Sequence, residues 1–69
     1  MTPALAKLVN AVKAHAIANY DRGSWGHVVD GYNTRELARL ISTFPVSTEE
    51  EAIRAMESHL AQLGDTESF

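Results

Sequence analysis

The stretch Tyr-Asp-Arg-Gly-Ser-Trp-Gly-His-Val-Val-Asp-Gly-Tyr occupies residues 20–32 and differs in composition from the rest of the chain. It contains the only tryptophan, both tyrosines and three of the four glycines. Because Trp25 is bracketed by Gly23 and Gly26, it is either the anchor of a small core or the centre of a binding surface. The segments on both sides of this stretch have the apolar periodicity of amphipathic helices.

The middle of this stretch reads better as a helix than as a strand. A strand would present a poor apolar face, made of Trp25, His27, Val29 and Gly31. A helix places apolar residues at i, i+3, i+4 and i+7, namely Trp25, Val28, Val29 and Tyr32. Ser24 is placed to cap the start of such a helix and Gly31 to end it. We therefore predict a short helix; the alternative is an α+β fold with a single strand at about 25–30 pairing across a homodimer.

The segment before this stretch predicts a long helix over residues 3–22. Thr2 is a good N-cap, and Pro3 suits the first helical position, where its missing N–H does no harm. Apolar residues then recur at three- and four-residue intervals: Leu5, Leu8, Val9, Val12, Ala16 and Tyr20. Gly23 is the candidate for the left-handed residue that ends this helix.

A third helix is predicted between Asn33 and Pro45. Asn33 as N-cap places Glu36 where the reciprocal partner of a capping box stands, with Tyr32 and Leu37 at the two staple positions. The residues expected to be buried are Leu37, Leu40, Ile41 and Phe44. Pro45 stops the helix, because the residue before a proline is disfavoured in the helical region.

A fourth helix is predicted after residue 48, capped by either Ser47 or Thr48, each of which has a glutamate three residues later. Its acidic first turn suits the positive end of a helix. Its apolar residues are Ile53, Met56, Leu60 and Leu63. Gly64 is expected to close it, which gives a single helical domain over 1–64 and a frayed acidic tail over 65–69. The predicted fold is an all-α small helical bundle of three longer helices and one short central helix.

Composition restricts how such a chain is stabilised. It has 69 residues, which is near the lower limit for a domain that folds without disulfides or bound metal. It has no cysteine, so disulfides and thiolate metal sites are absent. Hydrophobic residues make up 45% and charged residues 22%, a globular balance. Tight helix packing or association with a partner is the remaining means of stabilisation.

Membranes and nucleic acids are not the expected partners. The longest apolar runs are far shorter than the roughly 20 residues that cross a bilayer, and no secretory signal is expected, so a cytoplasmic location is the default. The net charge is −3, and phosphate binding requires clustered cations. The six basic residues are dispersed: Lys7, Lys13, Arg22, Arg35, Arg39 and Arg54. The third and fourth helices resemble a helix-turn-helix in spacing, but the second would begin with three glutamates, which repel phosphates.

Catalytic and metal sites are not expected either. Ser24, His27 and Asp30 invite a nucleophile–base comparison, but along one short helix they project side by side and cannot form a relay. We expect Ser24 to be a helix cap and His27–Asp30 a surface pair. The histidines at 15, 27 and 59 lack a metal-binding spacing, so they are expected to be boundary or solvated side chains. We therefore predict a non-enzymatic protein without cofactor or metal.

The aromatic cluster is the candidate interaction site. Trp25 is interpreted first as a core residue, with a partly exposed aromatic patch as the alternative. The residues that would form or support this contact surface are Trp25, Tyr32, Tyr20, His27 and Asp30. Small residues opposite the apolar stripe of the first helix offer a possible face for self-association: Ala4, Ala11, Ala14 and Ala18. A homodimer is therefore one possible form.

The central block resembles one carried by short uncharacterised proteins of phages and other mobile elements. The matching positions are Tyr20, Asp21, Gly23, Trp25, Val28, Val29, Asp30, Tyr32 and Leu37. Gly26 departs from the pattern, where an aspartate is usual, and Asp30 replaces a glutamate. The resemblance implies a mobile-element setting and supplies no activity, cofactor or site residue.

The function expected from these observations is a non-enzymatic small protein-interaction module, an accessory or regulatory protein of a phage or mobile element that binds another protein. One alternative is an inhibitor of a host defence complex, similar to an anti-CRISPR protein. A less favoured alternative is a small regulator that binds nucleic acid through the fourth helix.

Overall fold

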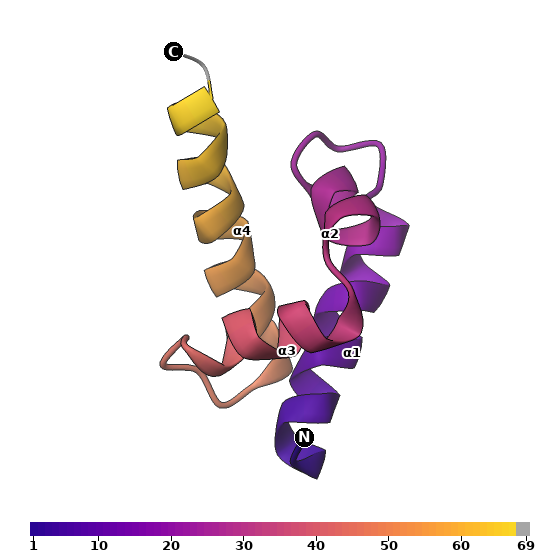
Figure 1. Ribbon diagram of the computed structural model, residues 1–69, viewed down its shortest axis with the longest axis vertical. Coiled ribbons are helices and arrows are strands. Elements are labelled where there is room, and N and C mark those ends of the chain that lie inside the picture. Colours follow the sequence, from indigo (N-terminus) through magenta and orange to yellow (C-terminus); the bar gives the residue numbers. More distant parts are fainter. Residues whose placement is uncertain (68–69) are drawn as a thin grey trace.

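The computed structural model describes the backbone of residues 1–67 and the side chains of residues 1–63. The chain forms four helices in order, α1 (Pro3–Ala18), α2 (Trp25–Gly31), α3 (Thr34–Ser42) and α4 (Glu49–Glu67), as Figure 1 shows. No strand is present in this part of the chain, so the fold is a small all-α bundle. The helical interpretation of residues 25–30 is confirmed over the alternative strand.

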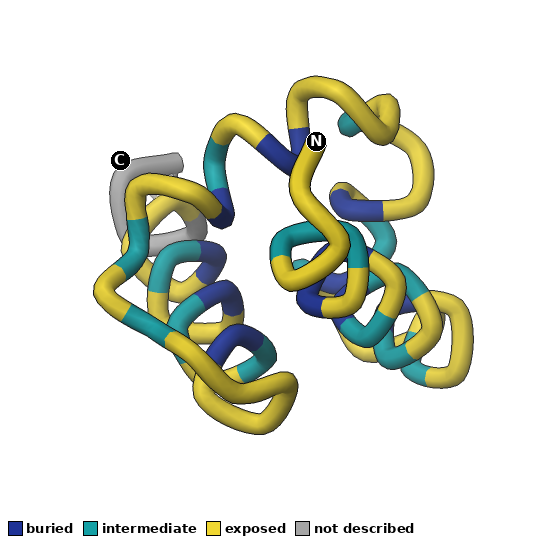
Figure 2. The backbone as a smooth tube through the Cα atoms, turned by 90° about the horizontal axis from the view of Figure 1, so that it is seen from below, coloured by how far each residue is buried: buried dark blue, intermediate teal, exposed yellow. Residues whose placement is uncertain are grey.

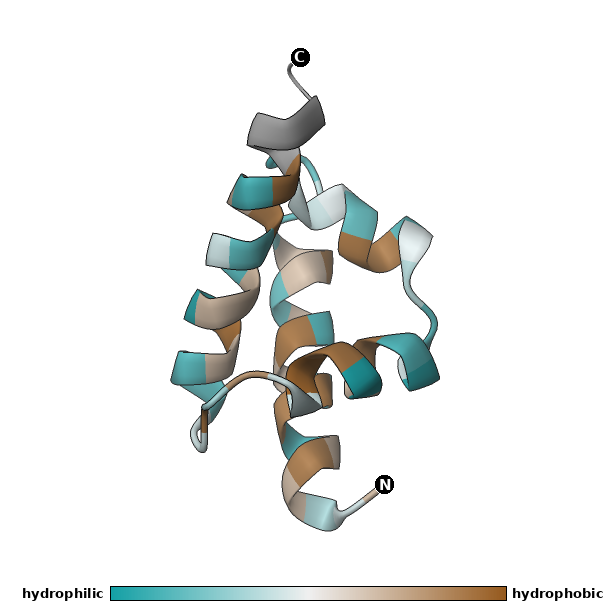
Figure 3. Ribbon diagram, turned by 60° about the vertical axis from the view of Figure 1, so that its left-hand side comes forward, coloured by the Kyte–Doolittle hydropathy of each residue, from teal (hydrophilic) through white to brown (hydrophobic). Residues whose placement is uncertain are grey.

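Helix α1 lies in the middle of the bundle. It makes substantial contact with each of the other three helices, which contact one another only slightly. In Figure 3, α4 runs along one side of α1, α2 lies on the other side, and α3 crosses in front of α1. Each of the other three helices is therefore stabilised mainly by its packing against α1.

The start of α1 is as predicted, and its end is not. Thr2 caps the helix, because its Oγ1 accepts a hydrogen bond of 3.1 Å from the N–H of Leu5. The helix ends at Ala18, and the prediction that it continues to residue 22 is wrong. Asn19 is the reason. Its side-chain amide donates a hydrogen bond to the His15 carbonyl at 2.9 Å, and its backbone N–H donates to the carbonyls of His15 and Ile17.

Gly23 has the left-handed conformation expected of it, with φ of 54°, but lies in the turn that leads into α2 and does not end α1. Ser24 occupies the N-cap position of α2 without capping it, because its side chain makes no capping hydrogen bond. Gly31 is the last residue of α2, and the chain then leaves in the extended conformation of Tyr32. With seven residues and no side-chain cap, α2 is held by its packing on α1.

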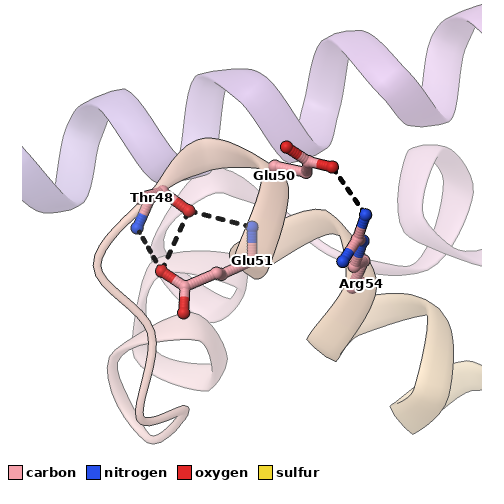
Figure 4. Close-up of polar contacts among 4 residues, drawn as sticks. All are labelled: Thr48, Glu50, Glu51 and Arg54. Carbon is pink, nitrogen blue, oxygen red and sulfur yellow. Dashed lines mark hydrogen bonds and ion pairs between the residues drawn. The ribbon is translucent and has the colours of Figure 1, made fainter.

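The caps of α3 and α4 follow the predicted pattern closely. The Glu36 N–H donates to the Asn33 Oδ1 at 2.8 Å, and the Asn33 side-chain amide donates to the Glu36 carboxylate at 2.9 Å. At the start of α4, the Glu51 N–H donates to the Thr48 Oγ1, and the Thr48 N–H donates to the Glu51 carboxylate, each at 3.2 Å. Figure 4 shows this reciprocal capping box, which selects Thr48 over Ser47 as the cap.

Helices α3 and α4 have different ends from those predicted. Helix α3 stops at Ser42, so Phe44 lies in the following loop. Helix α4 continues past Gly64 to Glu67, and the prediction that Gly64 closes it is wrong. A glycine inside a helix costs only about 1 kcal/mol relative to alanine, which does not suffice to end it. Of the tail expected over 65–69, residues 68 and 69 lie outside the described residues.

The core lies along the inner sides of the helices, where Figure 2 shows the buried positions in dark blue. Its members are Leu8, Val9, Val12, Ala16, Trp25, Val28, Leu37, Ala38, Ile41, Ala52, Met56 and Leu60. Leu40, Phe44 and Ile53 are only partly buried, and Leu63 is exposed, contrary to its place in the predicted stripe. Two alanines that were not expected in the core, Ala38 and Ala52, also belong to it.

The capping box generates a prediction about the stability of α4. Thr48→Ala should lower the free energy of unfolding by about 1 kcal/mol at neutral pH, because it leaves the Glu51 N–H without its acceptor. Ser47→Ala is the matched control and should have a smaller effect, since the Ser47 hydroxyl makes only a 3.3 Å bond to the same carboxylate. Urea unfolding followed by circular dichroism measures both; equal losses would contradict the assignment of the cap.

The same box predicts a pH dependence. Hydrogen bonds from the Thr48 hydroxyl, and then from the backbone N–H groups of Ser47 and Thr48, lower the pKa of Glu51. Because the pKa of Glu51 is lower in the folded state, the ionised carboxylate stabilises the fold at pH values above the pKa of the unfolded chain. This contribution is lost as the pH falls through the folded-state pKa. The difference in stability between wild type and Thr48→Ala should therefore shrink on acidification below the ordinary glutamate pKa.

Candidate protein-interaction surface

Trp25 lies in the core and fixes α2 against α1. Its side chain is only 6% exposed. Its ring meets the imidazole of His15 edge to face, with centroids 4.7 Å apart and planes at 67°. Such a pair adds a directional contact to the burial of apolar area. The structure thus places Trp25 beneath the surface, in a position to support a contact region and not to form its exposed face.

Tyr20 ties the turn after α1 to the outer side of α2. Its hydroxyl donates a 2.9 Å hydrogen bond to the Oδ2 of Asp30. Gly26 lies beneath it: a Cβ at this position would be 3.5 Å from the Tyr20 carbonyl oxygen and 3.9 Å from its Cε2, which is ordinary contact. Asp30 therefore pairs with Tyr20, and the expected pair with His27 is not among the contacts of the described residues.

The Tyr20–Asp30 bond also affects ionisation. The hydrogen bond to the Asp30 carboxylate, followed by its negative charge, raises the pKa of the Tyr20 hydroxyl above its ordinary value. The raised pKa means that the neutral phenol is favoured in the folded state. The resulting stability is present below the unfolded pKa and is lost as pH rises through the folded pKa.

Three large apolar side chains of α1, the following turn and α2 are exposed. Ile17 is 65% exposed, Tyr20 47% and Val29 41%. Ile17 and Val29 also line a shallow groove of about 230 Å³, together with Lys13, Val28, Tyr32, Asn33 and Thr34. We name the region formed by Ile17, Tyr20, Val29 and Tyr32 the α1–α2 patch. It joins the C-terminal half of α1 to the outer side of α2, the two helices that Figure 1 shows side by side.

Sequence reasoning identified only part of this patch. It named Tyr20 and Tyr32, and it placed Val29 in the apolar set of α2, but it did not single out Ile17. The available signal was that Ile17 is a large β-branched residue outside the apolar stripe of α1, where a solvent-facing position usually carries a polar side chain. Exposure of Val29 depends on how α2 docks on α1, which no local pattern determines.

No side-chain contact among the described residues joins Ser24, His27 and Asp30 to one another. Asp30 is bound to Tyr20, His27 is exposed, and Ser24 makes no capping bond. No group of three or more metal-binding side chains gathers among the described residues. Over the same part of the chain, no helix has the length and apolar character needed to span a bilayer.

The Tyr20–Asp30 bond can be tested by titration. In a Tyr32→Phe background, where Tyr20 is the only tyrosine, Asp30→Asn should lower the pKa of Tyr20 because both the hydrogen bond and the charge of the carboxylate are removed. Ultraviolet absorbance of the phenolate measures this pKa. Asp21→Asn is the matched control and should give a smaller decrease, since Asp21 contributes least to the shift. An unchanged pKa in Asp30→Asn would show that the bond does not form in solution.

Neither a known protein family, nor a curated protein, nor a solved structure shows a significant match to this chain. The assignment of a function therefore depends on the geometry of the α1–α2 patch and on the chemistry of its residues.

Proposed function

We propose that this protein is a non-enzymatic interaction module that binds another protein through the α1–α2 patch. The observation that carries the proposal is the clustering of exposed apolar side chains. Five large ones are exposed among the described residues; two of these, Ile17 and Val29, line one groove, and a third, Tyr20, is bonded to Asp30, the chain neighbour of Val29. Single exposed apolar residues are ordinary, whereas a group around a groove is typical of binding surfaces.

Two contacts hold the residues of the patch in place, one beneath it and one at its edge, and this order favours binding. The buried indole of Trp25 holds α2 on α1, and the Tyr20–Asp30 hydrogen bond holds the turn that joins them. A surface that is already ordered loses less conformational entropy on association. In this proposal Tyr20, Val29 and Tyr32 contact the partner, His27 contributes to the polar rim, and Trp25 and Asp30 maintain the geometry.

The biological setting is proposed from the resemblance of the central block to small phage and mobile-element proteins. An accessory or regulatory protein of such an element would act by binding a protein of its host. An inhibitor of a host defence complex is one form of this proposal. A second copy of the chain is another possible occupant of the patch, which would make the protein a homodimer.

The alternative of a nucleic-acid regulator acting through α4 receives less support. Arg54 is the only lysine or arginine of that helix, and its guanidinium lies 2.6 Å from the Glu50 carboxylate, so its charge is largely compensated (Figure 4). Glu49, Glu50 and Glu51 occupy the first turn, where they would repel phosphates. This charge arrangement favours a protein partner.

The proposal predicts that a charge placed in the patch abolishes partner binding. Val29→Glu should reduce the amount of partner recovered from a bacterial host lysate at least tenfold, because an unpaired carboxylate buried in an interface costs several kcal/mol. Leu63→Glu is the matched control: Leu63 is also 41% exposed, lies on α4 and is not among the residues of the patch. Circular dichroism should show both variants folded. Trp25→Ala is unsuitable as a probe, since loss of a buried indole costs about 3–5 kcal/mol.

Equal recovery with Val29→Glu and Leu63→Glu would show that the patch is not the binding surface. Light scattering after size exclusion distinguishes the homodimer from binding of a different protein. A dimer that Val29→Glu converts to a monomer would identify a second copy as the occupant, whereas a monomeric wild type would leave the partner as another protein.

A further inference from the structure

A second groove lies between the N-terminal half of α1 and the outer side of α3. It has a volume of about 570 Å³ and is lined by Met1, Leu5, Thr34, Arg35, Ala38, Arg39 and Ser42. Leu5 and Ala38 form part of its apolar floor, and Met1 is 67% exposed at its edge. We name it the α1–α3 groove. Figure 3 shows α3 crossing this half of α1.

The charged side chains that line this groove are both arginines. Arg35 and Arg39 stand one helical turn apart on α3, and no acidic side chain lines the groove. Neither arginine side chain has a hydrogen-bond or ion-pair partner among the described residues. The nearest acidic residue along α3, Glu36, is directed at the Asn33 side-chain amide, 2.9 Å away.

Three other basic side chains, unlike Arg35 and Arg39, have a side-chain partner. Lys7 lies 3.6 Å from the Glu49 carboxylate, and Arg54 is paired with Glu50. Lys13 donates to the Thr34 hydroxyl at 3.0 Å. In a chain with a net charge of −3, two neighbouring arginines without a carboxylate form a local positive region beside apolar side chains.

We propose that the α1–α3 groove binds an acidic amphipathic helix of a partner protein. Guanidinium groups bind carboxylates with two parallel hydrogen bonds, and Cβ atoms at i and i+4 lie about 5–6 Å apart on a helix. Two carboxylates at i and i+4 of the partner helix have the same spacing as Arg35 and Arg39. Its apolar side chains then pack on Leu5 and Ala38.

The apolar floor favours a protein over a nucleic acid. A phosphate backbone is bound by many cations, and this groove offers two arginines beside Leu5, Ala38 and the side chain of Met1. The proposal does not require the α1–α2 patch to be an interface. The two surfaces meet at Thr34, which lines both grooves, so they are tested separately.

The test begins with a displayed library of random peptides about 16 residues long, enough for four helical turns. Selection on the immobilised wild-type protein should enrich sequences with a net negative charge and with apolar residues at i, i+3 and i+4. Enriched peptides that are neutral or basic would overturn the proposal. A representative enriched peptide is then labelled and titrated by fluorescence anisotropy.

Arg35→Glu should weaken binding of this peptide at least tenfold, and Arg39→Gln should weaken it several-fold. A glutamate at position 35 suits the first turn of α3, so this variant is expected to remain folded. Arg22→Glu is the matched control, because it makes the same change in net charge at an exposed arginine outside the groove, and it should change the affinity less than twofold.

Three other outcomes would overturn the proposal. Equal weakening by Arg35→Glu and Arg22→Glu would indicate general charge attraction. Loss of peptide binding in Val29→Glu with retention in Arg35→Glu would place the peptide on the α1–α2 patch. Binding of a mixed DNA duplex that Arg35→Glu abolishes would identify the groove as a phosphate site. If Val29→Glu does not reduce recovery of the lysate partner, the proposed function of the α1–α2 patch is wrong. The peptide experiment on the α1–α3 groove is independent of that outcome.

Discussion

The apolar side of α1, which includes Val9, Val12 and Ala16, is buried under three helices that contact one another only slightly. In a chain of 69 residues without disulfides, this shared burial replaces the larger core of an ordinary domain. Ala16 and Ala52, on α1 and α4, are completely buried in this shared core. Each flanking helix then has one side left for solvent or for a partner, and the α1–α2 patch and the α1–α3 groove lie where α2 and α3 meet α1.

The four helices were predictable from local signals because those signals act over three or four residues. Thr2, Asn33 and Thr48 each accept a backbone N–H at a helix start, and the apolar repeats select the inner faces. The ends were harder to predict because competing groups decide them. The Asn19 amide ends α1 before Gly23 is reached, and α4 continues through Gly64 because one glycine weakens a long helix too little to break it.

The candidate surfaces were less predictable, since they depend on how helices dock. Val28 and Val29 both belong to the predicted apolar face of α2, yet Val28 is buried against α1 and Val29 is exposed. Tyr20 was assigned to the stripe of α1, but once that helix ends early its hydroxyl reaches Asp30 on α2. The spacing of Arg35 and Arg39 is visible in the sequence. That Leu5 lies across from them is a property of the tertiary fold.

The central position of α1 has a consequence for how the domain opens. Separation of α1 from its neighbours exposes the whole core at once, so global melting should be a single cooperative transition. Helix α2 is different: it has seven residues and no side-chain cap, and it is held by the buried side chains of Trp25 and Val28 and by the Tyr20–Asp30 hydrogen bond. Its amides should therefore exchange with solvent through a local excursion that leaves α1, α3 and α4 assembled. The segment that carries half of the α1–α2 patch should thus open more often than the rest of the bundle.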